Sequence, residues 1–140
     1  MTGLFLEDLS VGQSAELART VTGGDLDAFA AVTGDDNPVH LDETYAATTP
    51  FGGRIAHGML SAGYISAVIG TKLPGPGAIY VSQSLRFRRP VKIGDTVLAR
   101  AEITAIDADR ARVTLKTTCL VAGKAVVEGE AEVMVPRKGA

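Results

Sequence analysis

The chain is poor in cysteine and in long hydrophobic runs. Its one cysteine, Cys119, excludes an internal disulfide and is typical of a protein in a reducing cytosol. The longest apolar-rich stretch, residues 59–69, is too short and too interrupted by serine and glycine to span a bilayer. The opening residues, MTGLFLEDLSVGQ, lack the basic segment and apolar run of a signal peptide. We therefore expect a cytoplasmic protein that is not inserted in a membrane.

The chain also lacks an excess of either charge. Its 14 basic and 16 acidic residues give a net charge of −2, and no basic run is longer than Arg88-Arg89, so nucleic acid is not an expected partner. Hydrophobic residues make up 46% and charged residues 21%, which indicates a packed domain rather than disorder. The 140 residues suit a single domain, residues 1–140, that buries roughly two-thirds of its unfolded surface.

Three helices are predicted in the first half of the chain. The first spans residues 25–33 and ends at Gly34, a natural C-terminal stop. A short helix follows Asp42, which can cap it, and must end near Pro50. The third helix, residues 57–70, has apolar side chains around most of its circumference, which is typical of a helix buried nearly all round.

Alternation of apolar and polar residues predicts strands in the rest of the chain. The expected strands are residues 14–21, 78–88, 97–105, 113–121 and 127–135. An antiparallel sheet needs its apolar face covered, and the third helix is the large apolar cover available. These elements predict an α+β arrangement, the hot-dog fold, with the sheet wrapped around a central buried helix. One such unit leaves sheet edges bare, so we expect a homodimer.

The richest concentration of chemical groups is the stretch GDDNPVH, residues 34–40. Asp35 and His40 stand five residues apart, a spacing that turns their side chains away from each other on a helix or a strand. Pro38 pushes Asn37 out of the helical region, so residues 35–40 are predicted to form a turn. A turn can bring the carboxyl and imidazole groups together, which makes this pair a candidate for acid–base catalysis.

The same stretch resembles the signature of the MaoC-like hydratases, or (R)-specific enoyl-CoA hydratases. The resemblance continues through LDETYAATTPFGGRIAHGML and GAIYVSQSLRFRRPVKIGDTV and covers nearly the whole chain. It implies a dimeric hot-dog protein, with a tunnel near the dimer interface, that adds water across the 2,3 double bond of a trans-2-enoyl thioester. The expected product is the (R)-3-hydroxyacyl thioester. The thioester carrier is coenzyme A or an acyl-carrier protein, with no metal or redox cofactor.

The resemblance also implies roles for individual residues. Asp35 and His40 become the catalytic pair that activates water and returns a proton to the substrate. Gly58, at the start of the third helix, becomes the donor to the substrate carbonyl, because it has a free N–H and no side chain in the way. Asn37 and Ser66 are candidate substrate-binding residues, although Ser66 can equally bond back to its own helix.

Further candidates have simpler alternatives. Ile69 and Val133 are candidate acyl-binding residues, and the alternative for both is that they simply pack in the core. Four basic residues could meet the phosphates of coenzyme A or simply line a wet sheet face: Arg86, Arg88, Arg89 and Lys92. His57 is expected to be a structural histidine near the helix start, and Cys119 is expected in the core.

Three alternative interpretations have less support from the same residues. A metal site from Asp35, His40 and Asp42 does not match known ligand spacings. A hot-dog thioesterase would need a carboxylate on the buried helix, and residues 57–70 contain none. A non-catalytic acyl-thioester binder would not need the pairing of Asp35 with His40. The pathway stays open among fatty-acid oxidation, fatty-acid synthesis and polyhydroxyalkanoate supply.

Overall fold

The computed structural model describes residues 3–139, in which a six-stranded antiparallel sheet is the largest element. The strands lie in the order β1-β4-β5-β6-β2, and the short strand β3 also pairs with β6. Their bounds are β1 Ser14–Thr20, β2 Ile79–Gln83, β3 Arg86–Phe87, β4 Thr96–Asp107, β5 Arg112–Val121 and β6 Lys124–Met134. Before β1 lies a single 3-10 turn, η1 (Leu6–Asp8). The predicted strands are confirmed, apart from the division between β2 and β3.

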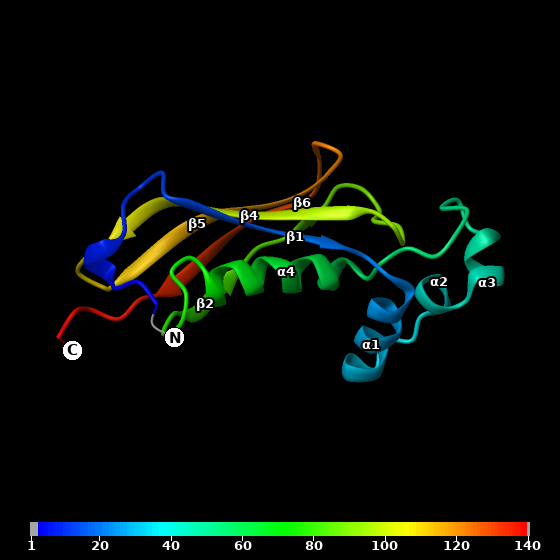
Figure 1. The fold of residues 1–140 in the computed structure, drawn as a ribbon, viewed down its shortest axis with the longest axis horizontal. Helices are drawn as coiled ribbons and strands as arrows, with labels where there is room; N and C mark the ends of the chain where they lie inside the picture. Colours follow the sequence, from blue (N-terminus) through cyan, green and yellow to red (C-terminus); the bar gives the residue numbers. More distant parts are fainter. Residues whose placement is uncertain (1–2, 140) are drawn as a thin grey trace.

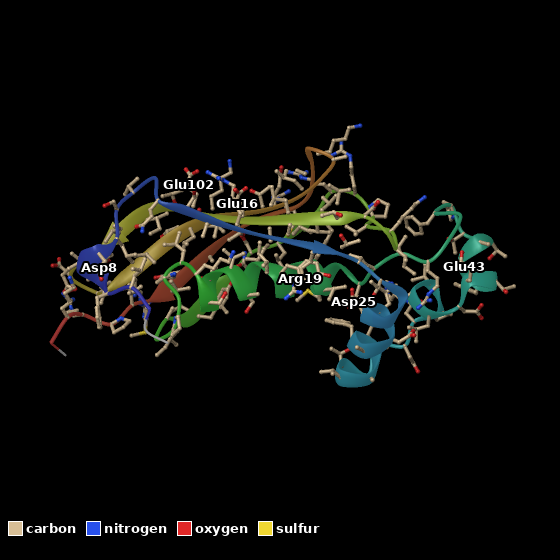
Figure 2. The ribbon with its side chains drawn as sticks, in the orientation of Figure 1. Asp8, Glu16, Arg19, Asp25, Glu43 and Glu102 are labelled. Carbon is tan, nitrogen blue, oxygen red and sulfur yellow. The ribbon has the colours of Figure 1, made fainter. Side chains whose placement is uncertain are left out.

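Helix α4 (Gly58–Thr71) lies along one face of this sheet (Figure 1) and contacts β1, β4, β5 and β6. Its buried side chains meet the inward residues of the strands, where alternate positions are apolar. The fully buried members of this core include Ile65, Val68, Ile69, Val97, Ile103, Leu115 and Val133. Glu16 and Glu102 lie on the opposite face of the sheet, turned away from α4 (Figure 2). This sheet around a helix confirms the predicted α+β hot-dog arrangement.

Three further helices gather at one end of the molecule (Figure 1): α1 (Gly23–Thr33), α2 (Pro38–Leu41) and α3 (Glu43–Ala47). Helix α1 begins with a capping box, in which the side chains of Thr22 and Asp25 each bond the other's backbone N–H. It ends at Gly34, whose φ of 84° is the left-handed conformation that glycine adopts easily. Asp42 caps α3 by accepting a bond from the backbone N–H of Tyr45. Both predicted helix boundaries are confirmed.

The expected strand over residues 78–88 is wrong in detail, because it divides into β2 and β3. The break lies at Ser84, whose backbone carbonyl passes so close to Gly129 on β6 that a Cβ on Gly129 would collide with it. Apolar residues of this edge, Ile79, Val81 and Phe87, are exposed. A single chain therefore leaves an apolar sheet edge uncovered.

The expectation that the third helix is buried nearly all round is also wrong for the single chain. Ser61, Ile65, Val68 and Ile69 are buried against the sheet, but Met59, Gly63, Ser66 and Gly70 are exposed on the other side. The exposed side includes small residues and borders a cavity described below. Within residues 3–139, no helix combines the length and apolar character needed to span a membrane.

Candidate active site

Residues 34–37 join α1 to α2. The stretch from Asp35 to His40, which we call the acid–base loop, covers this connection and most of α2 and brings its two acid–base groups together. Asn37 caps α2, its side-chain oxygen accepting the backbone N–H of Val39 at 3.1 Å, and Pro38 takes the first helical position. His40 therefore stands on a helical turn, not on the open turn expected from the sequence. A carboxylate oxygen of Asp35 and ring nitrogens of His40 and His57 all lie within 4.8 Å of one another. The predicted convergence of Asp35 and His40 is present.

A backbone carbonyl fixes the imidazole of His40. Its Nδ1 lies 2.7 Å from the carbonyl oxygen of Ile55, and because a carbonyl can only accept, Nδ1 carries the proton and donates. The other ring nitrogen, Nε2, then bears the lone pair of the neutral ring. Half-buried and oriented in this way, His40 can accept a proton or hold a water molecule at Nε2.

His57 supports the other member of the pair. It is 2% exposed, and its Nε2 donates to the backbone carbonyl of Asp35 at 2.9 Å. Its ring stacks on that of His40, with centroids 3.9 Å apart, and lies 4.5 Å from the ring of Phe29. Its Nδ1 is buried and finds no hydrogen-bond partner in the part of the chain that the structure describes. The hydrogen bond expected of a structural histidine near the helix start is present, and it acts directly on the Asp35 backbone.

The segment Arg54–His57 connects this loop to the body of the protein. On one side, the N–H of Ala56 donates to the carbonyl of Val91 at 2.7 Å. On the other, the N–H of Ile55 donates to the carbonyl of Val39 at 3.3 Å, beside the bond from His40 to Ile55. One extended segment therefore holds the acid–base loop and leads directly into α4.

Gly58, the first residue of α4, lies against the ring of Phe87. A Cβ built on Gly58 would approach Cε1 of Phe87 to 2.5 Å, so a side chain cannot fit without moving the ring. The N–H groups of the first helical turn have no acceptor within the helix and carry the positive end of its dipole. This end of α4 can therefore stabilise a developing negative charge on a carbonyl oxygen. The contact with Phe87 was not foreseen from the sequence.

Two cavities meet at this site. The first, about 480 Å³, is lined by residues that include His40, Gly58, Ser61, Phe87, Arg88 and Arg89. The second, about 620 Å³, is lined by residues that include Asp35, Gly63, Ser66, Tyr80, Gln83 and Leu85. Met59 lines both. Because the Asp35 and His40 side chains converge from different cavities, a substrate that reaches both groups must lie across the junction.

The other predicted binding residues fall in different places. Ser66 lines the second cavity, whereas Ile69 and Val133 are fully buried in the core and line neither cavity. Asn37 lies beside the pair, but its side-chain oxygen is used to cap α2. The part that Ile69, Val133 and Asn37 play in substrate binding stays a prediction. Among the predicted basic residues, Arg88 and Arg89 border the first cavity.

Burial tunes two other polar groups. Partial burial raises the pKa of Tyr80 from its ordinary value near 10 to about 12. Its hydroxyl donates to Oε1 of Gln83 at 2.7 Å. Nε2 of Gln83 in turn donates to the buried hydroxyl of Thr117 at 2.9 Å. Burial also raises the pKa of the Cys119 thiol to about 12, and this fully buried residue confirms the core position expected for it.

With this geometry established, comparison with known proteins identifies the family. Residues 9–126 match the model of the MaoC like domain. The chain belongs to the MaoC-like family. It is 58% identical over 135 residues to an (R)-specific enoyl-CoA hydratase of Rhodospirillum rubrum, covering 96% of this chain and 94% of that protein.

Two further relatives agree with this assignment. A 3-hydroxybutyryl-CoA dehydratase of Methylorubrum extorquens is 52% identical over 96% of this chain and 86% of its own. The unliganded R-hydratase PhaJ1 of Pseudomonas aeruginosa superposes with a TM-score of 0.93 at 52% identity, covering 97% of this chain and 88% of that one. The MaoC-like resemblance and the hot-dog fold expected from the sequence are thereby confirmed.

The position of the Asp35 carboxylate predicts the effect of removing its charge. We expect Asp35→Asn to lower the turnover rate for an enoyl thioester by roughly 10²- to 10⁴-fold with little change in substrate binding, because an amide cannot hold and release a proton. Steady-state kinetics would measure this loss. His40→Ala should lose activity on a similar scale, and the double variant should lose less than the product of the two single losses.

Asp36→Asn is the matched control, because Asp36 is adjacent and exposed but is not among the residues lining either cavity. It should keep full activity, with the melting temperature of every variant checked. Loss of activity in Asp36→Asn but not in Asp35→Asn would contradict the placement of the catalytic carboxylate.

Proposed function

We propose that the protein is an (R)-specific enoyl-CoA hydratase, a hydro-lyase that reversibly adds water to a trans-2-enoyl thioester. The observation that carries the proposal is the convergence of Asp35 and His40 at the junction of two cavities, beside the start of α4. Hydrogen bonds of about 2.8 Å allow one water molecule to bridge groups up to about 5.6 Å apart. The 4.8 Å limit on the separation of these groups therefore suits a shared water.

The proposed reaction uses these groups in one step of proton exchange. Conjugation to the thioester carbonyl makes C3 electrophilic, so the water oxygen bonds to C3 while one of its protons passes to the pair. A proton from the pair is delivered to C2, and the carbon–carbon double bond becomes single. We assign the proton transfer to the Asp35 carboxylate and the orientation of water to Nε2 of His40. The reverse sequence eliminates water.

Negative charge builds on the thioester oxygen as water attacks C3. The N–H of Gly58 is the proposed donor to this oxygen, because the residue lies at the positive end of α4 and lines the first cavity with His40. The thioester then lies in the first cavity, with the arginines at its border available to coenzyme A phosphates. The acyl chain extends past Met59 into the second cavity toward Ser66.

The alternative functions fit this site less well. Residues 58–71 contain no carboxylate, so α4 offers no acid group for a thioesterase that activates water from the central helix. A non-catalytic binding module would not need an imidazole fixed by a backbone carbonyl and placed beside a carboxylate. The names of the relatives from Rhodospirillum rubrum and Methylorubrum extorquens support the hydratase assignment and the acyl-CoA substrate. A cytoplasmic location stays a prediction.

Hydration of crotonyl-CoA tests the proposal directly. Purified protein should remove the absorbance of the conjugated double bond without added cofactor, and chiral analysis should return (R)-3-hydroxybutyryl-CoA. Dialysis against a chelator should leave the rate unchanged, because the mechanism requires no metal at the cluster of Asp35, His40 and His57. Release of free coenzyme A would favour the thioesterase, binding without turnover would favour the binding module, and an (S) product would refute the proposed stereochemistry.

We also propose that the protein is a homodimer joined through the β2 edge. Within residues 3–139, β2 is an edge strand that pairs with β6 on one side and has its other hydrogen-bonding side free. Its exposed apolar residues Ile79 and Val81 continue to Phe87 on β3. A second copy of the same edge would pair with it in a two-fold arrangement. Such an interface would also cover the exposed side of α4 that borders the second cavity.

Light scattering should report about twice the 14.5 kDa chain mass at micromolar concentration. Val81→Lys should shift the protein toward the monomer, because it places charge in the proposed interface. Val11→Lys is the matched control, since Val11 is an exposed valine just before β1, the strand at the opposite end of the sheet from β2. A wild-type protein that is a stable and fully active monomer would rule out the dimer.

A further inference from the structure

Arg54 is a largely buried charged residue at the point where the acid–base loop meets the body of the protein. Its side chain is only 16% exposed, although the paired carboxylate of Asp27 on α1 is 68% exposed. Arginine is rarely buried unless its donors are used. The partners of its guanidinium therefore indicate what the side chain does.

The guanidinium joins two elements of the helical end of the molecule. Its Nε donates to the backbone carbonyl of His40 at 2.6 Å, and its Nη2 donates to Oδ1 of Asp27 at 3.0 Å. The next residue, Ile55, accepts the Nδ1 proton of the same histidine. His40 is thus held through its backbone by Arg54 and through its ring by Ile55.

This support matters because α2 cannot hold its own shape. A helix of four residues makes almost no internal hydrogen bonds, and its last carbonyls have no partner within the helix. The carbonyl of His40 is one of these groups. Arg54 supplies its hydrogen bond from a planar group that simultaneously binds a carboxylate, which the ammonium of lysine does less well.

We propose that Arg54 is a positioning residue for His40: it fixes the backbone of α2 so that the imidazole keeps its bond to Ile55 and presents Nε2 to the reaction. The inference rests on the proposed role of His40. The ion pair with Asp27 contributes less, because that carboxylate is mostly exposed. The bond from Nε to the His40 carbonyl is the part on which the position of the imidazole depends.

Arg54→Met tests this by keeping the length of the side chain and removing its donors. We expect kcat for crotonyl-CoA to fall by roughly 10- to 100-fold with little change in KM, since a small displacement of a catalytic group has a large effect on rate. Arg54→Lys, which retains one donor group, should recover part of that loss. Asp27→Asn should stay within about twofold of wild type, because it leaves the bond to His40 intact.

Arg100→Ala is the matched control for loss of an arginine, because Arg100 forms a 2.9 Å pair with Glu102 on the sheet face turned away from α4. Arg100→Ala should change neither kcat nor KM. An equal loss of kcat in Arg54→Met and in Arg100→Ala would overturn the proposal. So would a wild-type kcat in both Arg54→Met and Arg54→Lys. If Arg54→Met does not fold, Arg54→Lys decides: a wild-type kcat in that variant overturns it.

A second readout does not depend on activity. The chain contains two histidines, so a long-range ¹H–¹⁵N spectrum resolves the ring nitrogens of each. In the wild type, His40 should show the proton on Nδ1 and His57 the proton on Nε2, as their carbonyl partners require.

In Arg54→Met, or in Arg54→Lys where the former does not fold, the His40 signals should shift or show mixed tautomers while those of His57 stay in place. Unchanged His40 signals would overturn the positioning role. This result stands even if the wild type fails to hydrate crotonyl-CoA, so the failure of Arg54 as a positioning residue and the failure of the proposed function can be told apart.

Discussion

The site depends on the hydrogen bonds that tie the acid–base loop to the segment Arg54–His57. Four of them cross this junction: Arg54 to the His40 carbonyl, His40 to the Ile55 carbonyl, Ile55 to the Val39 carbonyl and His57 to the Asp35 carbonyl. The loop runs into α2, which has no fully buried residue and contributes only the half-buried Leu41 to the edge of the core. Its position is therefore set by directional polar contacts, which fix orientation more closely than apolar packing does.

The same segment links the acid–base groups to the proposed oxyanion donor. His57 ends the segment and immediately precedes Gly58, so the support for Asp35 and the start of α4 are consecutive residues. Helix α4 in turn is held against the sheet by buried residues such as Ile65 and Val68. The core thus fixes the position of the Gly58 N–H at the start of α4. The segment Arg54–His57 then fixes the position of Asp35 and His40 relative to that N–H.

Much of this arrangement could be predicted from the sequence. Alternation along the strands and the apolar helix indicated the fold, and Pro38 between Asp35 and His40 indicated convergence. The rest depends on contacts between residues far apart in the chain, which no local pattern records. The role of Arg54 could not be predicted from the sequence, because its partners, Asp27 and the His40 carbonyl, are 27 and 14 residues away. The break at Ser84 depends on Gly129 across the sheet, and the ring of Phe87 reaches Gly58 from another element.

The most direct test of the account is the position of a bound substrate. A crystal structure of Asp35→Asn with crotonyl-CoA should place the thioester oxygen within hydrogen-bonding distance of the Gly58 N–H. It should also show a water molecule that contacts Nε2 of His40 and the residue 35 side chain and faces C3 of the substrate. A thioester oxygen bound elsewhere, or C3 turned away from this water, would contradict the proposed use of the acid–base loop and of the start of α4.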